Sequence, residues 1–392
     1  MIDAVNELTT AFTDELIAFR RRLHTYPELS GQESATTEAI VDRLRVAGLA
    51  PVVLQRGTGV ICDIPGTSGR PMVALRADID ALAMNDLTTA SYQSRVPGVS
   101  HACGHDVHTA VVLGAGLVLQ ELSERGELSR SVRLIFEPAE ETMPGGAKDV
   151  IEQGGLDGVE RIFGLHCDPK IDVGTIGIRD GAITSAADAI EIHVLGPGGH
   201  TARPHLTVDL LSVVGRVLTL LPEAVIHRVG TTEAFSVVFG TVQSGHAANV
   251  IPARAVLRGS VRTTDLDAWD HAEKVVTEAL GDVLADTGAQ WELHYTRGVP
   301  PVVNEEVTTG MMRNAAAAVV GPAHVVETLR SMGGDTFAWF AQEVPAAFAR
   351  LGTHGPDMAL LDLHASTFDV DERAIGIGVR TLVGAVVMDA PN

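Results

Sequence analysis

Residues 101–141, HACGHDVHTAVVLGAGLVLQELSERGELSRSVRLIFEPAEE, contain the pattern that decides the fold. A long apolar run predicts a helix over Val107–Leu122, and Asp106 is placed to cap its first turn. The apolar run Val132–Phe136 has the length of a buried strand. A helix that leads into a fully apolar strand is typical of an α/β domain whose parallel sheet is covered on both faces. This alternation is therefore the expected framework of the chain.

The flanking sequence continues the alternation and then interrupts it. From about residue 184 to 297 the order becomes strand, helix, two strands, helix, strand, which is that of the ferredoxin-like split unit. We predict an α/β domain made of residues 1–183 and 298–392, with this α+β domain, residues 184–297, inserted into it. The other expected elements of the α/β domain are Gly59–Ile64, Met72–Arg76, Arg161–Leu165, Asn304–Val320 and Ala346–Leu351; those of the insert are Ala189–Val194, Val208–Leu221, Ala234–Val242, Ala255–Arg262, Leu266–Thr287 and Gln290–Tyr295.

Composition excludes several classes of partner. The 392 residues include 50 acidic and 29 basic side chains, for a net charge of −21, and no basic stripe that a nucleic acid or an anionic membrane would need. Three cysteines are too few for a disulfide framework, which favours a reducing compartment. The longest apolar runs are shorter than the roughly 20 residues that cross a bilayer. We expect a cytoplasmic protein with no nucleic-acid or membrane partner.

The N-terminal residues predict an amphipathic helix and not a secretory signal, because they lack a basic start and an apolar centre. His24, near the end of this helix, is expected to interact with the helix dipole. The expected apolar stripe consists of Ile2, Val5, Leu8, Phe12, Leu16 and Phe19.

Side chains suited to metal binding follow the predicted strands or precede the predicted helix. In an open α/β sheet such positions converge at the carboxyl ends of the strands. One thiolate, three imidazoles and a carboxylate suit zinc or a similar transition metal, and five ligands can hold two ions if one ligand bridges them. The motifs of nucleotide-binding loops, serine hydrolases and His-Glu-x-x-His metalloproteases are absent from the sequence. The candidate ligands are Cys103, His105, Glu141, His166 and His364, with Glu140 beside them.

Taken singly, each of these residues has an ordinary structural explanation. Cys103 could be a small core residue, and the pair Glu140 and Glu141 could be a solvated helix start. Their joint placement at strand ends favours a metal site. Two adjacent glutamates are useful there, since one can bind metal while the other takes a proton from a metal-activated water and returns it to a leaving group.

Several motifs together resemble one family, the metal-dependent amidohydrolases, in its branch of hippurate hydrolase, N-acyl-amino-acid amidohydrolases and indole-acetyl-amino-acid hydrolases, with aminoacylase and carboxypeptidase G as more distant relatives. The resemblance implies a zinc-peptidase-like catalytic domain with an inserted lid domain that can mediate a homodimer. It makes Cys103, His105, Glu141, His166 and His364 the ligands of a two-metal centre and Glu140 the general base. The motifs, in chain order, are HTYPELSGQE, LRADIDAL, HACGHDVHTA, FEPAEE, GLHCDP, GGHTARPH, NVIPARAVLRGSVR and LHASTFDVDE.

The resemblance also implies roles for residues outside the ligand set. His200 is similar to a lid histidine that stabilises the oxyanion, often in the partner subunit's site. Asn249 and Arg262 match lid positions that contact substrate, and an arginine suits a free α-carboxylate. Asp78 resembles a carboxylate that orients a metal ligand. Without the resemblance, these lid residues could be a turn, an Asx cap and a surface charge.

Two departures from the family pattern concern specificity. Where the family usually has Met-Gly-Ser-Glu-Asp-Phe, this chain reads SMGGDTF, with Asp335 at the glutamate position and Thr336 replacing the aspartate. Where a histidine commonly precedes Pro-Glu-Leu, this chain has Tyr26. Neither change removes a predicted ligand or the predicted base.

The sequence therefore predicts a dinuclear metal-dependent hydrolase that cleaves the amide bond of small-molecule N-acyl-amino acids. Thiolate ligation favours zinc, and the resemblance leaves manganese, cobalt or nickel open. A dipeptidase or carboxypeptidase with the same centre is the alternative within enzymes. A non-catalytic protein that binds acylated amino acids is a further alternative, but it would not need Glu140. A structural zinc protein is disfavoured because its ion would be fully coordinated by four protein ligands.

Overall fold

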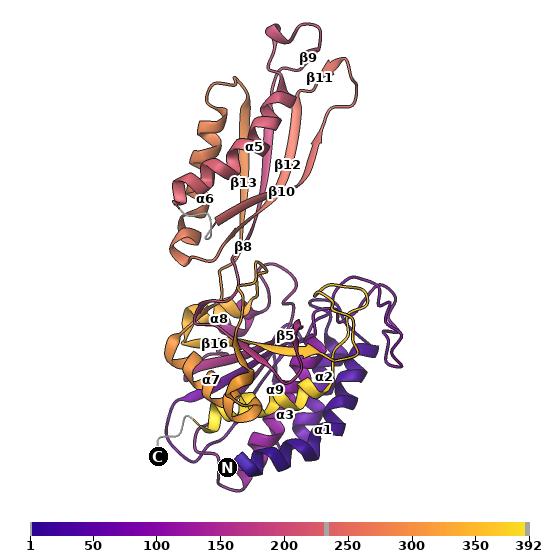
Figure 1. The fold of residues 1–392 in the computed structure, drawn as a ribbon, viewed down its shortest axis with the longest axis vertical. Helices are drawn as coiled ribbons and strands as arrows, with labels where there is room; N and C mark the ends of the chain where they lie inside the picture. Colours follow the sequence, from indigo (N-terminus) through magenta and orange to yellow (C-terminus); the bar gives the residue numbers. More distant parts are fainter. Residues whose placement is uncertain (1, 231–234, 389–392) are drawn as a thin grey trace. The chain divides into compact units, whose positions relative to one another are not determined.

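The computed structural model describes residues 2–230 and 235–388, and they form two compact units (Figure 1). The first unit comprises the chain up to Gly181, Val303–Leu329 and the chain from Thr336 onward. The second unit comprises Ala182–Val302 and Arg330–Asp335. The predicted fold class, an α/β domain carrying an inserted ferredoxin-like domain, agrees with this architecture.

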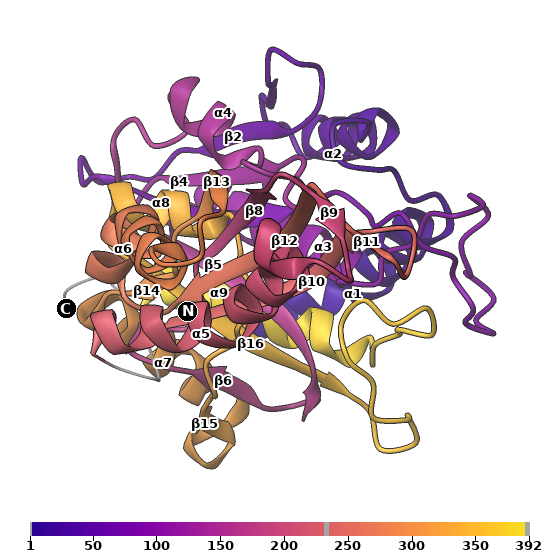
Figure 2. The same cartoon turned by 90° about the horizontal axis from the view of Figure 1, so that it is seen from above.

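The first unit is built on an eight-stranded mixed sheet with the order β1-β2-β4-β3-β5-β16-β6-β15. Its central strands β4, β3, β5 and β16 are parallel. Strand β2 is antiparallel to β4 and lies beside it (Figure 2). The strands are β1 (Val52–Val53), β2 (Val60–Ile64), β3 (Met72–Asp78), β4 (Val132–Glu137), β5 (Val159–Asp172), β6 (Ile176–Ile178), β15 (Val325–Glu327) and β16 (Ala346–His354). The helices are α1 (Ile2–Thr25), α2 (Ser34–Val46), α3 (His105–Glu124), α4 (Ala147–Glu152), α7 (Glu306–Val320), η2 (Pro322–His324), α8 (Phe337–Glu343) and α9 (Arg373–Val387).

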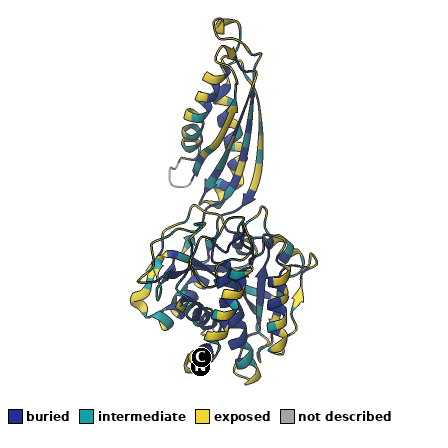
Figure 3. Ribbon diagram, turned by 90° about the vertical axis from the view of Figure 1, so that its right-hand side faces the viewer, coloured by how far each residue is buried: buried dark blue, intermediate teal, exposed yellow. Residues whose placement is uncertain are grey.

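Helices cover both faces of this sheet because its strands are apolar on both sides. Ala347, Ala349 and Leu351 of β16 lie in the same core as α3 and α9, and α1 packs on those two helices. Phe348 alternates with these residues and therefore points to the other face, where its ring stacks on Phe337 of α8 at 4.6 Å. Buried residues accordingly run along the strands and the inner sides of the helices (Figure 3).

The second unit has a four-stranded antiparallel sheet with the order β10-β12-β8-β13, the order of a ferredoxin-like fold. Its two long helices pack on one face, where Ile190, Ile192 and Val194 of β8 join their core. Residues that alternate with these, such as His193, lie on the other face of the sheet. The elements are β8 (Ala187–Leu195), β9 (Gly199–His200), η1 (Pro204–Leu206), α5 (Leu210–Val229), β10 (Phe235–Ser244), β11 (Val250–Ile251), β12 (Arg254–Thr263), α6 (Leu266–Leu284) and β13 (Gln290–Val299), with β7 (Gly181–Ala182) and β14 (Val303–Asn304) at the ends of the insert.

Among the described residues, α5 is the one helix whose length and apolar composition would suit a membrane crossing. One side of α5 packs into the core of the second unit. The predicted strand Ala234–Val242 corresponds to β10 from Phe235, and Ala234 lies outside the described residues.

The observed units differ from the predicted division in two respects. The second unit runs from Ala182 to Val302, where residues 184–297 were predicted. Arg330–Asp335, expected in the α/β domain, belongs to the second unit. The reason is a set of hydrogen bonds to the start of the insert, since Ser331 N–H donates to Ile183 O at 2.9 Å and Ser185 N–H donates to Gly333 O at 3.1 Å.

One expectation for the helix ends is wrong. Asp106 does not cap α3, because the helix begins at His105 and its N-cap position is Gly104, with no side-chain cap. Asp106 is instead fully buried and accepts from Arg20 Nε at 2.7 Å and pairs with His24 Nδ1 at 2.8 Å. His24 lies in the last turn of α1, as expected, and this buried carboxylate also holds it.

Candidate metal centre

The candidate centre lies at the carboxyl ends of neighbouring parallel strands. Asp78 ends β3 and is in register with Glu137, which ends β4. His166 lies in β5, the strand on the other side of β3. The parallel pairing therefore brings segments distant in sequence to one edge of the sheet, as open α/β sheets do at their binding sites.

A tight turn before α3 presents the thiol and the first imidazole. Gly104 separates Cys103 from His105 and has φ +87°, a conformation that disfavours side chains. A Cβ at Gly104 would also lie 2.9 Å from the Cys167 side chain. Only glycine fits here, and the turn places Cys103 and His105 together at the start of the helix.

His166 is oriented toward the thiol. Its Nδ1 lies 2.8 Å from the carbonyl oxygen of Cys167, so that nitrogen carries the proton and donates. Its Nε2 then has a lone pair and lies 3.5 Å from Cys103 Sγ. Burial and the neighbouring His108 hold the pKa of His166 well below its usual value, which keeps the ring neutral, as metal ligation requires.

His105 is oriented by Asp80. Its Nδ1 lies 2.9 Å from the carbonyl oxygen and 3.2 Å from Oδ1 of Asp80, a carboxylate–histidine arrangement typical of metal sites. Its Nε2 is buried and, among the described residues, has no hydrogen-bond partner. Such an orphaned lone pair in a buried position needs an explanation, and a metal ion provides one.

His364 approaches from the C-terminal segment in a strained conformation. Its φ is +60°, a left-handed value that is uncommon for a residue other than glycine. Its backbone N–H donates to Ala102 O at 2.8 Å, next to Cys103. Its Nε2 lies 3.3 Å from Glu141 Oε1, and this hydrogen bond raises the pKa of His364.

The loop that carries Glu140 and Glu141 is fixed by buried groups. Ala139, just before them, has a left-handed φ of +56°, and its N–H donates to the buried carboxylate of Glu33 at 2.8 Å. Glu141 N–H donates to Asp80 Oδ2 at 3.0 Å. The N–H of Thr336 donates to Glu140 Oε1 at 3.1 Å. The loop therefore presents two adjacent carboxylates in defined positions.

The electrostatics of the cluster favour a bound cation. Burial opposes a charge on His105, but Asp78 and then Cys103 and Asp80 outweigh it and raise its pKa well above the usual value. Burial raises the pKa of the Cys103 thiol, and a coordinated metal would deprotonate such a thiol. Surroundings that attract a proton to His105 also attract a divalent ion to its Nε2.

The structure thus brings together the five predicted ligands and the predicted base. Their candidate ligand atoms form overlapping groups in which all atoms lie within 4.8 Å of one another. These groups are Cys103, His105 and His166; Cys103, Glu141 and His364; and His105, Glu140 and Glu141.

Asp78 has a different contact from the one expected. It pairs with His108 Nδ1 at 2.6 Å, and its Oδ2 lies 3.7 Å from His105 Nε2. The residue that orients His105 is Asp80, which the sequence reasoning missed although it lies only two residues beyond Asp78, the last residue of β3. His108, which is not among the predicted ligands, uses both of its nitrogens within the protein, because its Nε2 accepts from Cys167 N–H at 2.8 Å and its Nδ1 pairs with Asp78.

Comparison with known proteins agrees with this geometry. The model of Peptidase family M20/M25/M40 matches residues 74–387. The chain belongs to this family. The predicted resemblance to metal-dependent amidohydrolases is confirmed, as is the fold of a catalytic domain with an inserted lid domain.

Some relatives of this M20 protein are named as amidohydrolases or deacetylases, and others have different names. It is 37% identical over 363 residues to the N-acetyl-L-cysteine deacetylase of Bacillus subtilis (strain 168), covering 92% of this chain and 85% of that protein. It is 44% identical over 377 residues to a protein of Rhodococcus jostii (strain RHA1) named as a glutamate–cysteine ligase; the match covers 96% of this chain and 47% of that protein, so the chain spans about half its length. A solved structure, described as a dinuclear metal binding peptidase from the M20 family of Bacillus subtilis, has a TM-score of 0.84 and 34% identity, and covers 97% of this chain and 98% of that one.

The predicted lid residues of the M20 protein fall into two places within the second unit. His200 of β9 pairs with Val250 of β11, and Asn249 O accepts from Thr201 N–H at 3.2 Å, so His200 and Asn249 are neighbours (Figure 1). Arg262 lies near the other end of β12, where its Nη1 donates to Met332 O at 2.7 Å. The structure does not bring Arg262 together with the other two.

The residues that depart from the family pattern, Tyr26, Asp335 and Thr336, can also be located in the structure. Tyr26 is 52% exposed, and its hydroxyl accepts from Arg95 Nη1 at 3.5 Å. Asp335 and Thr336 are both buried. The sequence reasoning connected the change at Thr336 only with specificity and missed the backbone contact of this residue with Glu140.

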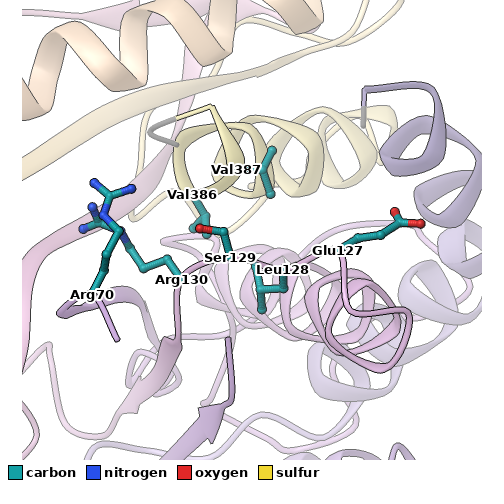
Figure 4. Close-up of a pocket in the computed structure, with 7 residues that line it drawn as sticks. All are labelled: Arg70, Glu127, Leu128, Ser129, Arg130, Val386 and Val387. Carbon is teal, nitrogen blue, oxygen red and sulfur yellow. The ribbon is translucent and has the colours of Figure 1, made fainter. Parts of the chain in front are cut away.

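A small cavity in the first unit does not belong to the centre. It has a volume of about 40 Å³ and is lined by Arg70, residues 127–130, Val386 and Val387 (Figure 4). It lies near the amino end of β4, whereas the ligands lie at the carboxyl ends of the strands. Space for about one water molecule excludes it as a substrate site.

Proposed function

We propose that this M20 protein is a dinuclear metallohydrolase that cleaves the amide bond of N-acyl-amino acids, releasing a carboxylic acid and an amino acid. The observation that carries the proposal is the group of candidate ligands beside a carboxylate, Glu140, that the ligand set does not require. Cys103, His105 and His166 of this group are buried, Glu141 is partly buried and His364 is exposed. The orphaned His105 Nε2 fits a metal ligand, and the Bacillus subtilis relative of known structure is described as binding two metals.

The chain's own residues supply binding and proton transfer. Metal ions held there would lower the pKa of a coordinated water and polarise an acyl oxygen. Glu140 takes a proton from the attacking water and returns it to the leaving nitrogen, a role for which a positioned carboxylate contributes roughly 10²–10⁴ in rate. Asp80 and the carbonyl oxygen of Cys167 keep the rings of His105 and His166 oriented for ligation. Thiolate and imidazole donors favour zinc as the native ion.

The lid residues support a homodimer as part of this proposal. His200 and Asn249 are separated from Arg262 by most of β12, Arg254–Thr263, which at ~3.4 Å per residue exceeds the size of an N-acyl-amino acid. One small substrate therefore does not reach both groups of one chain. We infer that Arg262 binds the α-carboxylate and that His200 and Asn249 serve the site of a second copy. The three free, buried cysteines fit a cytoplasmic location.

The decisive experiment is release of free amino acid from a panel of N-acetyl- and N-benzoyl-amino acids, dipeptides and C-terminally blocked substrates, with and without chelator. We expect hydrolysis of N-acyl-amino acids that chelator abolishes and metal restores. Glu140→Gln should lower kcat about 10²–10⁴-fold while bound metal stays unchanged. Preference for dipeptides would indicate the dipeptidase or carboxypeptidase alternative, and activity that survives metal removal would refute the mechanism.

A further inference from the structure

Thr336 occupies a helix-capping position without acting as a cap. It directly precedes α8, yet its side chain makes no capping hydrogen bond, although threonine at this position commonly does. The residue is 1% exposed. Its hydroxyl is committed elsewhere, because it donates to Glu137 Oε1 at 2.6 Å and accepts from Arg76 Nη2 at 3.0 Å.

The two partners of this hydroxyl are themselves fixed. Arg76 Nε donates to Glu137 Oε2 at 2.6 Å and Arg76 Nη1 donates to Asp78 Oδ2 at 2.7 Å. Arg76 is 1% exposed and lies two residues before the end of β3, and Glu137 is fully buried at the end of the adjacent strand β4. A fully hydrogen-bonded buried network of this kind rigidifies the residues it contains. The hydroxyl therefore ties Thr336 to the strand ends that form the candidate centre.

The backbone of Thr336 in turn holds Glu140. Its N–H donates to Glu140 Oε1 at 3.1 Å. The same loop passes over the threonine methyl group at Gly145, where a Cβ would lie 2.2 Å from Thr336 Cγ2. Thr336 thus contacts both the carboxylate of Glu140 and the loop that carries it.

We propose that Thr336 is a positioning residue that aims the Glu140 carboxylate, with its hydroxyl anchored on Arg76 and Glu137; this rests on the proposed role of Glu140 as the base. A hydroxyl suits the position because it donates to one neighbour and accepts from the other at the same time. The aspartate usual in the family pattern would place a further negative charge beside Glu137 and Glu140. The threonine that replaces the family's aspartate at position 336 is accordingly the residue that holds Glu140 in place.

The matched variants are Thr336→Val, which removes the hydroxyl at nearly constant shape, and Thr336→Ser, which keeps it. Crystal structures of each are compared with the wild type for the distance from residue 336 N to Glu140 Oε1. We expect the bond to persist in T336S and the Glu140 carboxylate to be displaced or disordered in T336V. Thr336→Ala gives the same comparison should the valine variant not fold.

Kinetics of the metal-loaded variants provide a second measurement. We expect kcat of T336V to fall about 10- to 100-fold with KM and bound metal unchanged, because a small misplacement of a catalytic group acts on the chemical step, and T336S to retain most of the rate. The proposal is overturned if the Glu140 carboxylate keeps its place in T336V. It is also overturned if T336V has a higher KM and less bound metal while its kcat is unchanged. If no substrate of the panel is cleaved, the proposed function fails, while the crystal structures still decide whether Thr336 positions Glu140.

Discussion

Both units of this protein hold a group of histidines and glutamates with metal-binding geometry, yet the two groups differ in every other respect. In the first unit, Cys103, His105 and His166 are buried and His105 Nε2 has no hydrogen-bond partner among the described residues. In the second unit, the candidate atoms of His193, Glu292 and His294 also lie within 4.8 Å of one another, but the group is on the open face of the sheet. Proximity of ligand types alone therefore does not define a site.

The pairing of the charges explains the difference. His193 bonds to Glu191, which also accepts from Arg258 Nε at 2.6 Å, and His294 Nε2 lies 3.5 Å from Glu292 Oε1. The two His–Glu contacts each lie along one strand, and Arg258 lies opposite Glu191 on the neighbouring strand. Such opposite charges across strands are ordinary stabilising pairs on an exposed sheet face. A metal ion would have to displace them, whereas the buried group already has an unused lone pair.

The largest effect should follow from breaking the buried group. Cys103→Ser should reduce bound metal and lower kcat/KM by more than the roughly 10–100-fold that losing an outer-shell partner of a ligand costs. The matched variant His294→Asn should change neither. Metal content by elemental analysis and rates on the best substrate of the panel measure both. A drop in metal content for His294→Asn would show that the exposed group also holds an ion.

The second effect concerns stability and uses two arginines. Arg20 is fully buried and pairs with Asp106 at 2.7 Å, Asp369 at 3.1 Å and Glu372 at 3.3 Å. Arg20→Met leaves Asp106 buried without its main partner and should lower the free energy of unfolding by about 3–5 kcal/mol. Arg258→Met, in the exposed pair with Glu191, should cost less than about 1 kcal/mol. Urea unfolding of both variants measures this, and equal losses would contradict the distinction between the two regions.

The same contrast shows what sequence reasoning could reach. Strand-end positions predicted the buried group, since the residues after Val132–Phe136 and Arg161–Leu165 necessarily meet at one edge of a parallel sheet. The order of elements likewise predicted the ferredoxin-like insert. Both inferences depend on patterns local to the chain, which the sequence displays directly.

Side-chain contacts between residues far apart in the sequence could not be predicted from such local patterns. The pairing of Asp106 with Arg20 spans 86 positions, and that of Thr336 with Arg76 spans 260. Local rules suggested a cap for Asp106 and a dipole partner for His24, because propensity at a helix end says nothing of a buried arginine from another helix. The choice between Asp78 and Asp80 as the partner of His105 likewise depends on ring orientation, which only the folded chain fixes.

The smallest expected effect is a pH dependence of protein stability that arises from the buried network of His24, Arg20 and Asp106. Burial disfavours a charge on His24, but Asp106 and then Asp86 outweigh it and raise its pKa, while Arg20 opposes them. A raised pKa in the folded state means that protonated His24 stabilises the fold below its unfolded pKa of about 6.5, and that this contribution is lost as the pH rises through the folded pKa. Wild-type Tm should therefore fall above pH 6.5 relative to His24→Gln under the same metal conditions. Thermal unfolding of both proteins between pH 6 and 9 measures the difference, and parallel profiles would show that His24 is not charged in the folded protein.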